Sequence, residues 1–268
     1  MTEYTDMKYF DIHAHYTDSR FSEEYPGGAD ALLDELFSGS ISGIINVAVS
    51  PENCLEVIEQ AKKYPNMYTA LGIHPTDGTR LDVCPEEAVA RIRSLVLDKA
   101  NKCVAIGEIG LDYHYPDTNK ELQQEYFELQ MQLARELDMP VCIHDRDSHA
   151  DVLSVIKKYP DVRGVLHSFS GSVEMARELV GLGYMISFSG VLTFTNAKKS
   201  REVAKTLPKS SIMIETDCPY LSPHPHRGEL NHSARLEYTV RVLAELIGLT
   251  EAECANLTEE NARRFFGI

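Results

Sequence analysis

Short apolar runs alternate with longer helix-like stretches along almost the whole chain, and this alternation most constrains the fold. The runs are rich in Val and Ile and mostly lack polar–apolar alternation, which is typical of parallel strands buried on both faces. The predicted strands are Lys8–Ile12, Gly43–Val49, Met67–Ile73, Cys103–Ile109, Pro140–His144, Gly164–His167, Tyr184–Phe188 and Ser211–Thr216. Eight strands separated by helices predict a (β/α)8 barrel of the TIM type.

Helix signals fill the segments between these strands. The predicted helices are Glu52–Lys63, Glu86–Lys99, Asn119–Leu137, Asp147–Lys158, Ser172–Leu182, Lys198–Thr206, Ser233–Ile247, Thr250–Asn256 and Thr258–Phe266. Pro51 and Pro85 stand at helix starts, and Ser50 is a plausible N-cap. Thr250 and Glu253 have the spacing of a capping box, whereas Thr258 begins only a partial one.

The main alternative fold is an open, doubly wound sheet. No G-x-G-x-x-G motif follows the first strand, so the principal dinucleotide-binding signature is missing and the barrel is favoured. No linker or shift in composition divides the 268 residues, and we expect a single domain over 1–268.

Composition limits the partners and the compartment. A formal charge of −15 argues against a protein that coats duplex DNA, but an enzyme that takes one strand end into a local site remains possible. The six cysteines form no C-x-x-C pair, and we expect them reduced. Met1 to Tyr9 is polar and lacks a signal-peptide core, and no run has transmembrane length. We therefore expect a cytoplasmic monomer with no membrane contact and no obligate protein partner.

Residue types that ligate metals lie at the ends of predicted strands one, four, five, six and eight. They are His13, His15, Glu108, His144, His167 and Asp217. The carboxyl ends of barrel strands meet at one rim, where barrel active sites are built. Four imidazoles and two carboxylates are enough for two divalent cations that share one bridging group.

Each of these residues also has an ordinary explanation. His13 and His15 point the same way in an extended segment and can hold one ion, but two surface histidines give the same pattern. Glu108 lies in an apolar run and needs a partner, either a basic residue or a pair of cations that it bridges. Asp217 could instead cap a helix or turn. The coincidence of all six at strand ends favours the metal site.

The sequence resembles the TatD family of metal-dependent hydrolases, within the amidohydrolase-like barrels. The matching stretches are FDIHAH, GIHP, AIGEIGLDYH, QQEYFELQMQLARELDMPVCIHDRD, LHSFSG and ETDCPYLSPHPHRGELN, from about Phe10 to Phe266. The resemblance implies that one metal is surrounded by His13, His15, Glu108 and Asp217. It implies that the second is surrounded by Glu108, His144 and His167.

The resemblance also implies further roles around the metals. His74 is expected to face a phosphate, and Asp112 and Arg146 to orient ligands or substrate. One departure from the family pattern follows RGELN, where an acidic residue and proline are common but this chain has His232 and Ser233.

The expected activity is metal-dependent hydrolysis of phosphodiester bonds in DNA. The resemblance implies a deoxyribonuclease, expected to act as a 3′-to-5′ exonuclease on single-stranded or frayed ends. In this mechanism a metal-activated water attacks the phosphate, Asp217 is the general base and Glu108 holds the metals in place. Tyr16, Tyr113 and Phe169 are candidates for stacking on bases. The ions are predicted to be Zn²⁺, Mg²⁺ or Mn²⁺, with no choice among them.

Two alternatives stay open. The same site in related barrels cleaves amides, lactones, esters and phosphotriesters, so the substrate could be a non-DNA ester, an amide or an aminoacyl-tRNA linkage. A non-catalytic barrel with a structural ion is the other, although structural sites are usually closed by protein ligands.

Overall fold

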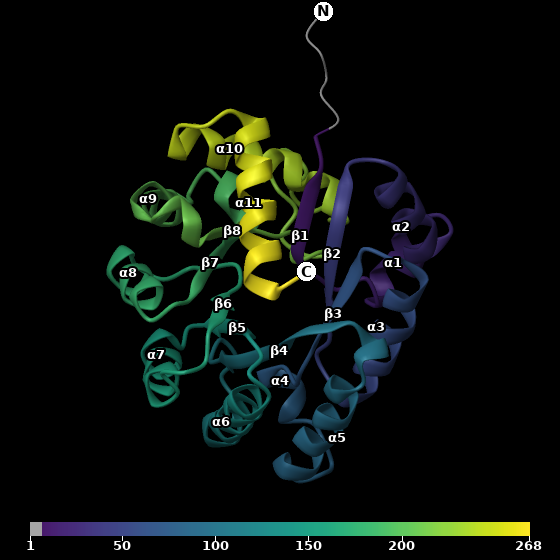
Figure 1. The fold of residues 1–268 in the computed structure, drawn as a ribbon, viewed down its shortest axis with the longest axis vertical. Coiled ribbons are helices and arrows are strands. Elements are labelled where there is room, and N and C mark those ends of the chain that lie inside the picture. Colours follow the sequence, from purple (N-terminus) through teal and green to yellow (C-terminus); the bar gives the residue numbers. More distant parts are fainter. Residues whose placement is uncertain (1–6) are drawn as a thin grey trace, which may run out of the picture.

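Eight parallel strands pair in chain order into one sheet that curves into a barrel, with the helices outside it (Figure 1). The computed structural model describes residues 7–268, so most of the N-terminal segment expected to carry no export signal lies outside the described residues. The strands are β1 (Tyr9–Ala14), β2 (Ile41–Val47), β3 (Met67–Leu71), β4 (Cys103–Asp112), β5 (Val141–Arg146), β6 (Gly164–Leu166), β7 (Met185–Phe188) and β8 (Ile212–Ile214). The predicted (β/α)8 barrel and its eight strands are confirmed.

The helices mostly agree with the predictions. The two differences are helices that were not predicted and a predicted break that is absent. They are α1 (Ser19–Glu24), α2 (Gly28–Ser38), α3 (Pro51–Lys63), α4 (Pro75–Gly78), α5 (Pro85–Leu97), α6 (Lys120–Leu137), α7 (His149–Lys158), α8 (Val173–Gly181), α9 (Lys198–Thr206), α10 (Leu236–Ile247) and α11 (Glu251–Phe266), with single turns η1 (Lys99–Asn101), η2 (Gly190–Thr193), η3 (Lys209–Ser211) and η4 (Ser233–Arg235). The pair α1 and α2 and the short α4 were not predicted.

None of the described helices combines the length and apolar character that a membrane crossing requires.

The C-terminal region is one helix, α11, and the predicted break before Thr258 is wrong. Thr258 is buried, and its hydroxyl donates to the carbonyls of Cys254 and Ala255 at 3.0 and 3.1 Å. Since the hydroxyl is satisfied within the preceding turn, it does not cap a new helix. Thr250 does form the predicted capping box with Glu253 at the start of α11.

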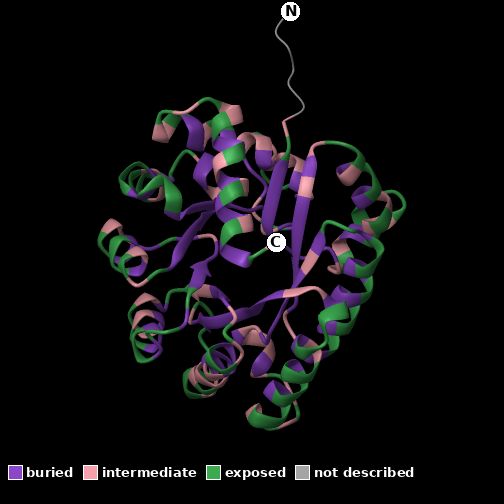
Figure 2. Ribbon diagram, in the orientation of Figure 1, coloured by how far each residue is buried: buried purple, intermediate pink, exposed green. Residues whose placement is uncertain are grey.

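Apolar side chains fill both sides of the barrel wall, and the exposed residues lie on the outer faces of the helices (Figure 2). The outer layer packs the strands against the helices. The interior contains Phe10, Ile45 and Val165, and it is joined by Phe265 and Phe266 from the end of α11. Packing of α11 therefore closes one end of the barrel, and a cavity is left at the other.

Irregular pairing occurs at two of the strands that carry the candidate ligands. Between Asp11 and Ala14 strand β1 advances three residues while β2 advances two. Between Ile106 and Ile109 strand β4 likewise advances three residues while β5 advances two. An extra residue of this kind is a β-bulge, which reverses the facing of the residues beyond it. The bulges allow Phe10 and Ile12 to fill the interior while the side chains of His13 and Glu108 turn toward each other at the carboxyl ends of the strands.

The barrel closes between β1 and β8 near the carboxyl ends of these strands. The Asp217 amide donates to the His13 carbonyl at 2.9 Å, and the His15 amide donates to the Cys218 carbonyl at 2.8 Å. The buried carboxylate of Asp11 adds a side-chain link, because it accepts from the Thr216 amide at 3.0 Å. The first and last strands are thus joined where the candidate ligands lie.

Candidate metal centre

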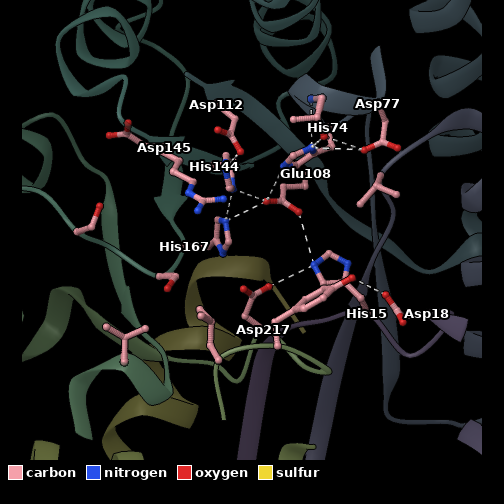
Figure 3. A pocket seen from close by; sticks show the side chains of 18 of the residues that line it. His15, Asp18, His74, Asp77, Glu108, Asp112, His144, Asp145, His167 and Asp217 are labelled. Atoms are coloured by element: carbon pink, nitrogen blue, oxygen red, sulfur yellow. Dashed lines mark hydrogen bonds and ion pairs between the residues drawn. The ribbon is translucent and has the colours of Figure 1, made fainter. Parts of the chain in front are cut away.

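A cavity of about 740 Å³ opens at the carboxyl ends of the strands. Five of the six candidate ligands line it, and His13 lies behind them, fully buried. Figure 3 shows the labelled side chains converging on Glu108 from several strands. The structure therefore brings together all six residues that the sequence singled out.

The two carboxylate oxygens of Glu108 face different groups of side chains. On one side, Oε2 lies 3.5 Å from His13 Nε2 and 3.6 Å from His15 Nε2. The Oδ1 atom of Asp217 lies 3.4 Å from the same atom of His15, so it joins this group. On the other side, Oε1 lies 2.9 Å from both His144 Nδ1 and His167 Nε2. Glu108 is thus placed between two sets of potential ligands.

Each of the four histidines has its other ring nitrogen engaged away from Glu108. His13 Nδ1 lies 3.1 Å from Cys142 Sγ, and His15 Nδ1 lies 3.0 Å from the Val47 carbonyl. His144 Nε2 lies 3.3 Å from Asp112, and His167 Nδ1 lies 3.2 Å from Glu215. A ring that donates its proton outward leaves a lone pair directed at the cluster, which is the arrangement of metal-bound histidines.

The carboxylates and imidazoles of the cluster shift one another's pKa values toward the charged forms. Burial acts to raise the pKa of Glu108, but the imidazoles, with His167 first, outweigh it and hold this pKa well below its usual range. Burial acts to lower the pKa of His167, but Glu108 raises it well above the usual value. The Asp217 pKa is also lowered, because the hydrogen bond from His15 and the nearby histidines outweigh its burial. Both carboxylates are therefore ionised at neutral pH.

The donor set fits divalent cations. Imidazole nitrogens and carboxylate oxygens gather within a few ångströms, and His13-His15-Glu108 and Glu108-His144-His167 each form a compact group able to hold an ion. Such a mixed set suits zinc, manganese and similar ions. An open cavity beside the cluster differs from a closed structural site and leaves room for a substrate.

Asp217 lies three residues beyond the end of β8, in the loop that leads to η4. Its φ of 57° is in the left-handed region, which Asp and Asn adopt more readily than other non-glycine residues. The loop is held by Asn231, whose buried amide donates to the carbonyls of Thr216 and Tyr220 at 3.0 and 2.6 Å. The chain thereby fixes the backbone on both sides of Asp217.

The three predicted substrate residues also line the cavity. His74 caps α4, where its Nδ1 accepts from the Thr76 amide at 3.2 Å, so a neutral ring carries its proton on Nε2. That atom lies 3.7 Å from Glu108. Asp112 contacts His144, as expected of a residue that orients a ligand, and Arg146 lies exposed at the end of β5.

Of the three aromatic residues considered for stacking, Tyr16 and Tyr113 do not line the cavity, and Phe169 lines it but is almost fully buried. Tyr16 is buried, and its hydroxyl lies 2.7 Å from Ser233 Oγ. Tyr113 is half-buried with its hydroxyl bonded to Asp151, and Phe169 lines the cavity but is only 5% exposed. These positions do not suit stacking on a base.

Glu215 is a supporting residue that the sequence reasoning missed. It is fully buried, and Oε1 accepts from the Ser168 amide at 2.8 Å beside its contact with His167. The signal that singled out Glu108, a carboxylate at the end of an apolar run, is also present in the stretch Ile212-Met213-Ile214-Glu215.

We expect Glu215→Ala to weaken metal binding or activity by about 10- to 100-fold, as is typical when the outer partner of a metal-bound histidine is removed. Metal affinity by chelator competition and kcat/KM measure this effect. Glu215→Gln is the matched control, because its carbonyl oxygen still accepts both hydrogen bonds. Equal losses in the two variants would contradict the role of this oxygen in orienting His167.

His232 and Ser233 follow the RGELN stretch, and Ser233 links this loop to residues near the start of the chain. Ser233 donates to Asp11 Oδ2 at 2.7 Å, and its amide donates to the Tyr16 hydroxyl at 3.0 Å. His232 is largely buried, and its Nδ1 has no hydrogen-bond partner among the described residues. Burial, with a contribution from Arg235, lowers the pKa of His232 to about 4.

We therefore expect His232→Leu to raise the free energy of unfolding at pH 7 by about 1 kcal/mol, because it removes a buried, unsatisfied polar atom. The gain should grow as the pH falls. The unfolded chain takes up a proton at His232 below about pH 6.5, whereas the folded chain does so only near pH 4, so the wild type loses up to about 3 kcal/mol across this interval. Urea unfolding at pH 7 and pH 5 measures both effects. A variant that loses stability with acid as steeply as the wild type would contradict the assignment.

Comparison with known proteins identifies the family. The family model described as "TatD related DNase" matches residues 10–267. A Bacillus subtilis protein described as an uncharacterized metal-dependent hydrolase, YabD, is 38% identical over 97% of this chain and 99% of its own length. The Escherichia coli metal-dependent hydrolase YcfH, also described as uncharacterized, is 35% identical over 96% of this chain and 95% of its own.

A solved structure gives the same result. The crystal structure of YjjV, a TatD homologue from Escherichia coli, superimposes with a TM-score of 0.89 at 30% identity and covers 98% of this chain and 100% of that one. The family match, the relatives and the shared barrel agree over essentially the whole length described. The chain belongs to the TatD family of metal-dependent hydrolases.

Proposed function

We propose that this protein is a deoxyribonuclease that hydrolyses phosphodiester bonds with two divalent cations held at the Glu108 cluster. The observation that carries the proposal is that the two oxygens of Glu108 face separate groups of ligands. A carboxylate placed in this way suits a bridge between two ions, which in two-metal sites are typically about 3.5–4 Å apart. The DNA substrate is supported by the family description.

In this proposal His13, His15, Glu108 and Asp217 hold one ion, and Glu108, His144 and His167 hold the other. Bound there, the cations would lower the pKa of the attacking water and neutralise charge on the phosphate. The chain itself supplies the positions of these ligands through its two bulges and through the outer contacts of each histidine.

Asp217 is the proposed general base. Its side chain is 15% exposed, compared with 4% for Glu108, so it reaches the cavity more freely than the bridging carboxylate. Its lowered pKa keeps it ionised at neutral pH, ready to accept the proton of the attacking water. The same carboxyl then returns the proton to the leaving oxygen.

His74 and Arg146 are the proposed phosphate contacts. The Nε2–H of His74 is the donor on the cavity side of that ring, as its bond with Thr76 requires. The guanidinium of Arg146 lies at the rim of the same cavity. Both groups can donate to a phosphate oxygen as its charge increases.

Digestion of end-labelled single- and double-stranded DNA tests the proposal. Metal-stripped protein is supplied with Mg²⁺, Mn²⁺ or Zn²⁺, and Glu108→Ala serves as the inactive control. Metal-dependent cleavage supports the deoxyribonuclease, and products shortened stepwise from the 3′ end support 3′-to-5′ exonuclease action. Intact DNA with every metal would refute the DNA substrate, and a panel of esters, amides and aminoacyl-tRNA then tests the alternative substrates of the same site.

A further inference from the structure

Two exposed tyrosines line the cavity beside the metal centre. Tyr115 is 54% exposed and Tyr220 is 46% exposed. Only two other large apolar side chains are as open among the described residues, and these, Leu55 and Leu97, lie on the outer helices α3 and α5. An exposed aromatic ring inside a polar cavity is the kind of feature that marks a binding surface.

The two rings belong to opposite sides of the barrel. Tyr115 lies in the loop after β4, and Tyr220 lies in the loop after β8. Strands β4 and β8 are four positions apart in a ring of eight, so the loops that follow them stand across the mouth from each other. The candidate metal ligands lie between them, because Glu108 comes from β4 and Asp217 from the loop after β8.

Neighbouring groups hold both rings in place. The Tyr220 hydroxyl donates to Asp18 Oδ2 at 2.5 Å, which ties the β8 loop to the loop after β1. The guanidinium of Arg146 lies 5.8 Å from the centre of the Tyr115 ring, within range of a cation–π contact. Aromatic faces that are fixed before a ligand arrives lose less conformational entropy when it binds.

Positive charge around the cavity is scarce. Among the lining residues that the structure describes, Arg146 is the only Lys or Arg, whereas six are Asp or Glu. The whole chain carries a formal charge of −15. Proteins that follow a long nucleic-acid backbone do so along a positively charged groove, and the described lining of this cavity offers one Lys or Arg side chain.

From these observations we infer that the cavity takes a short single-stranded segment, with the bases on either side of the cleaved phosphate stacked on Tyr115 and Tyr220. This inference rests on the proposed function and adds how the substrate is recognised. Stacking uses the flat face that every base has, so little sequence preference is expected. A base inside a duplex has its faces covered by its neighbours, so paired ends must open before they enter.

The scarcity of Lys and Arg side chains limits how many nucleotides contribute to binding. Phosphates beyond the one at Arg146 and the proposed cations meet no further Lys or Arg side chain in the described lining, so further nucleotides add little to binding. The logarithm of affinity for a single strand should fall with the logarithm of salt concentration with a slope of about −0.7 for one neutralised phosphate. A protein that tracks a long strand would show a several-fold steeper slope.

The test compares KM and kcat for a thymidine tetranucleotide and for the same sugar–phosphate backbone without bases. Tyr115→Leu and Tyr220→Leu are expected to raise KM for the thymidine substrate by roughly 5- to 100-fold, with kcat and metal content little changed. Tyr115→Phe and Tyr220→Phe restore KM because they keep the aromatic face. On the backbone without bases, the leucine variants and the wild type should have the same KM.

Tyr68→Leu is the matched control, since Tyr68 is half-buried in β3 and lines a separate pocket with Phe266 and Ile268, away from the metal cluster. Wild-type cleavage of the tetranucleotide with unchanged KM in both leucine variants would overturn this inference and leave the proposed function standing. An equal rise in KM on the backbone without bases would also overturn it, because the rings would then act otherwise than by stacking. Wild-type protein that cleaves neither substrate with any metal would overturn the proposed function and the inference together.

Discussion

Replacement of Glu108 by alanine is expected to lower kcat/KM by roughly 10³-fold or more, because catalysis by bound cations supplies several kcal/mol of transition-state stabilisation. Glu108 is the carboxylate that faces both groups of ligands, at 2.9 Å on one side and 3.5–3.6 Å on the other. Without it, the carboxylates of Asp217, Asp112 and Glu215 still contact histidines, but none of them lies between the two groups. We expect the variant to lose both ions, as measured by metal analysis after dialysis together with the rate of DNA cleavage.

Glu108→Gln separates charge from shape at the same position. The amide keeps one oxygen ligand but cannot bridge two cations with a delocalised negative charge, so binding of one ion at most is expected. Thermal unfolding of the metal-free proteins shows whether each variant is folded. An alanine variant that is folded and binds two ions as tightly as the wild type would remove Glu108 from the bridging position.

Asp217→Asn is expected to lower kcat by about 10²- to 10⁴-fold while most of the metal stays bound, because general-base catalysis typically contributes this much. Asn retains an oxygen ligand and tolerates the left-handed φ of 57° at this position. Its amide cannot accept the proton of the attacking water. The variant therefore tests proton transfer with little change in the backbone.

The pH dependence of kcat for the wild type and for Asp217→Asn measures this role. The wild-type rate should fall in acid as Asp217 is protonated, and the lowered pKa of this carboxyl places the fall below its usual range. The residual rate of the variant should lack that step. Wild-type turnover by Asp217→Asn at pH 7 would show that another group is the base, and metal analysis would distinguish this result from loss of an ion.

The strands were predictable because burial on both faces leaves continuous Val- and Ile-rich runs. The bulges in β1 and β4 were not, since each arises from the pairing of one strand with its neighbour. An ideal strand that places Phe10 and Ile12 in the interior would turn His13 away from the cavity. The Nε2 atoms of His13 and His15 still lie 3.1 Å apart, and the expectation that these residues hold one ion stays a prediction.

Residues that act through exposure or through distant partners were harder to find. Thr258 has the spacing of a helix start, but its hydroxyl bonds to the preceding turn. Tyr115 and Tyr220 are ordinary loop tyrosines in the sequence, and only the folded chain leaves them open to the cavity. The reverse holds for Tyr16, which was a candidate for stacking because it lies beside the H-x-H motif but is buried in the structure. The roles proposed for the six metal-ligand candidates remain predictions for the experiments above.

The seam between β1 and β8 has a consequence for when the enzyme becomes active during its synthesis. Asp11 and Thr216, which meet there, are 205 positions apart in the chain. The proposed ligands come from both sides of this seam, so a nascent chain that still lacks β8 holds an incomplete site. Hydrolase activity should therefore arise only after the ribosome has released most of the protein, and amino-terminal fragments that end before Asp217 should be inactive.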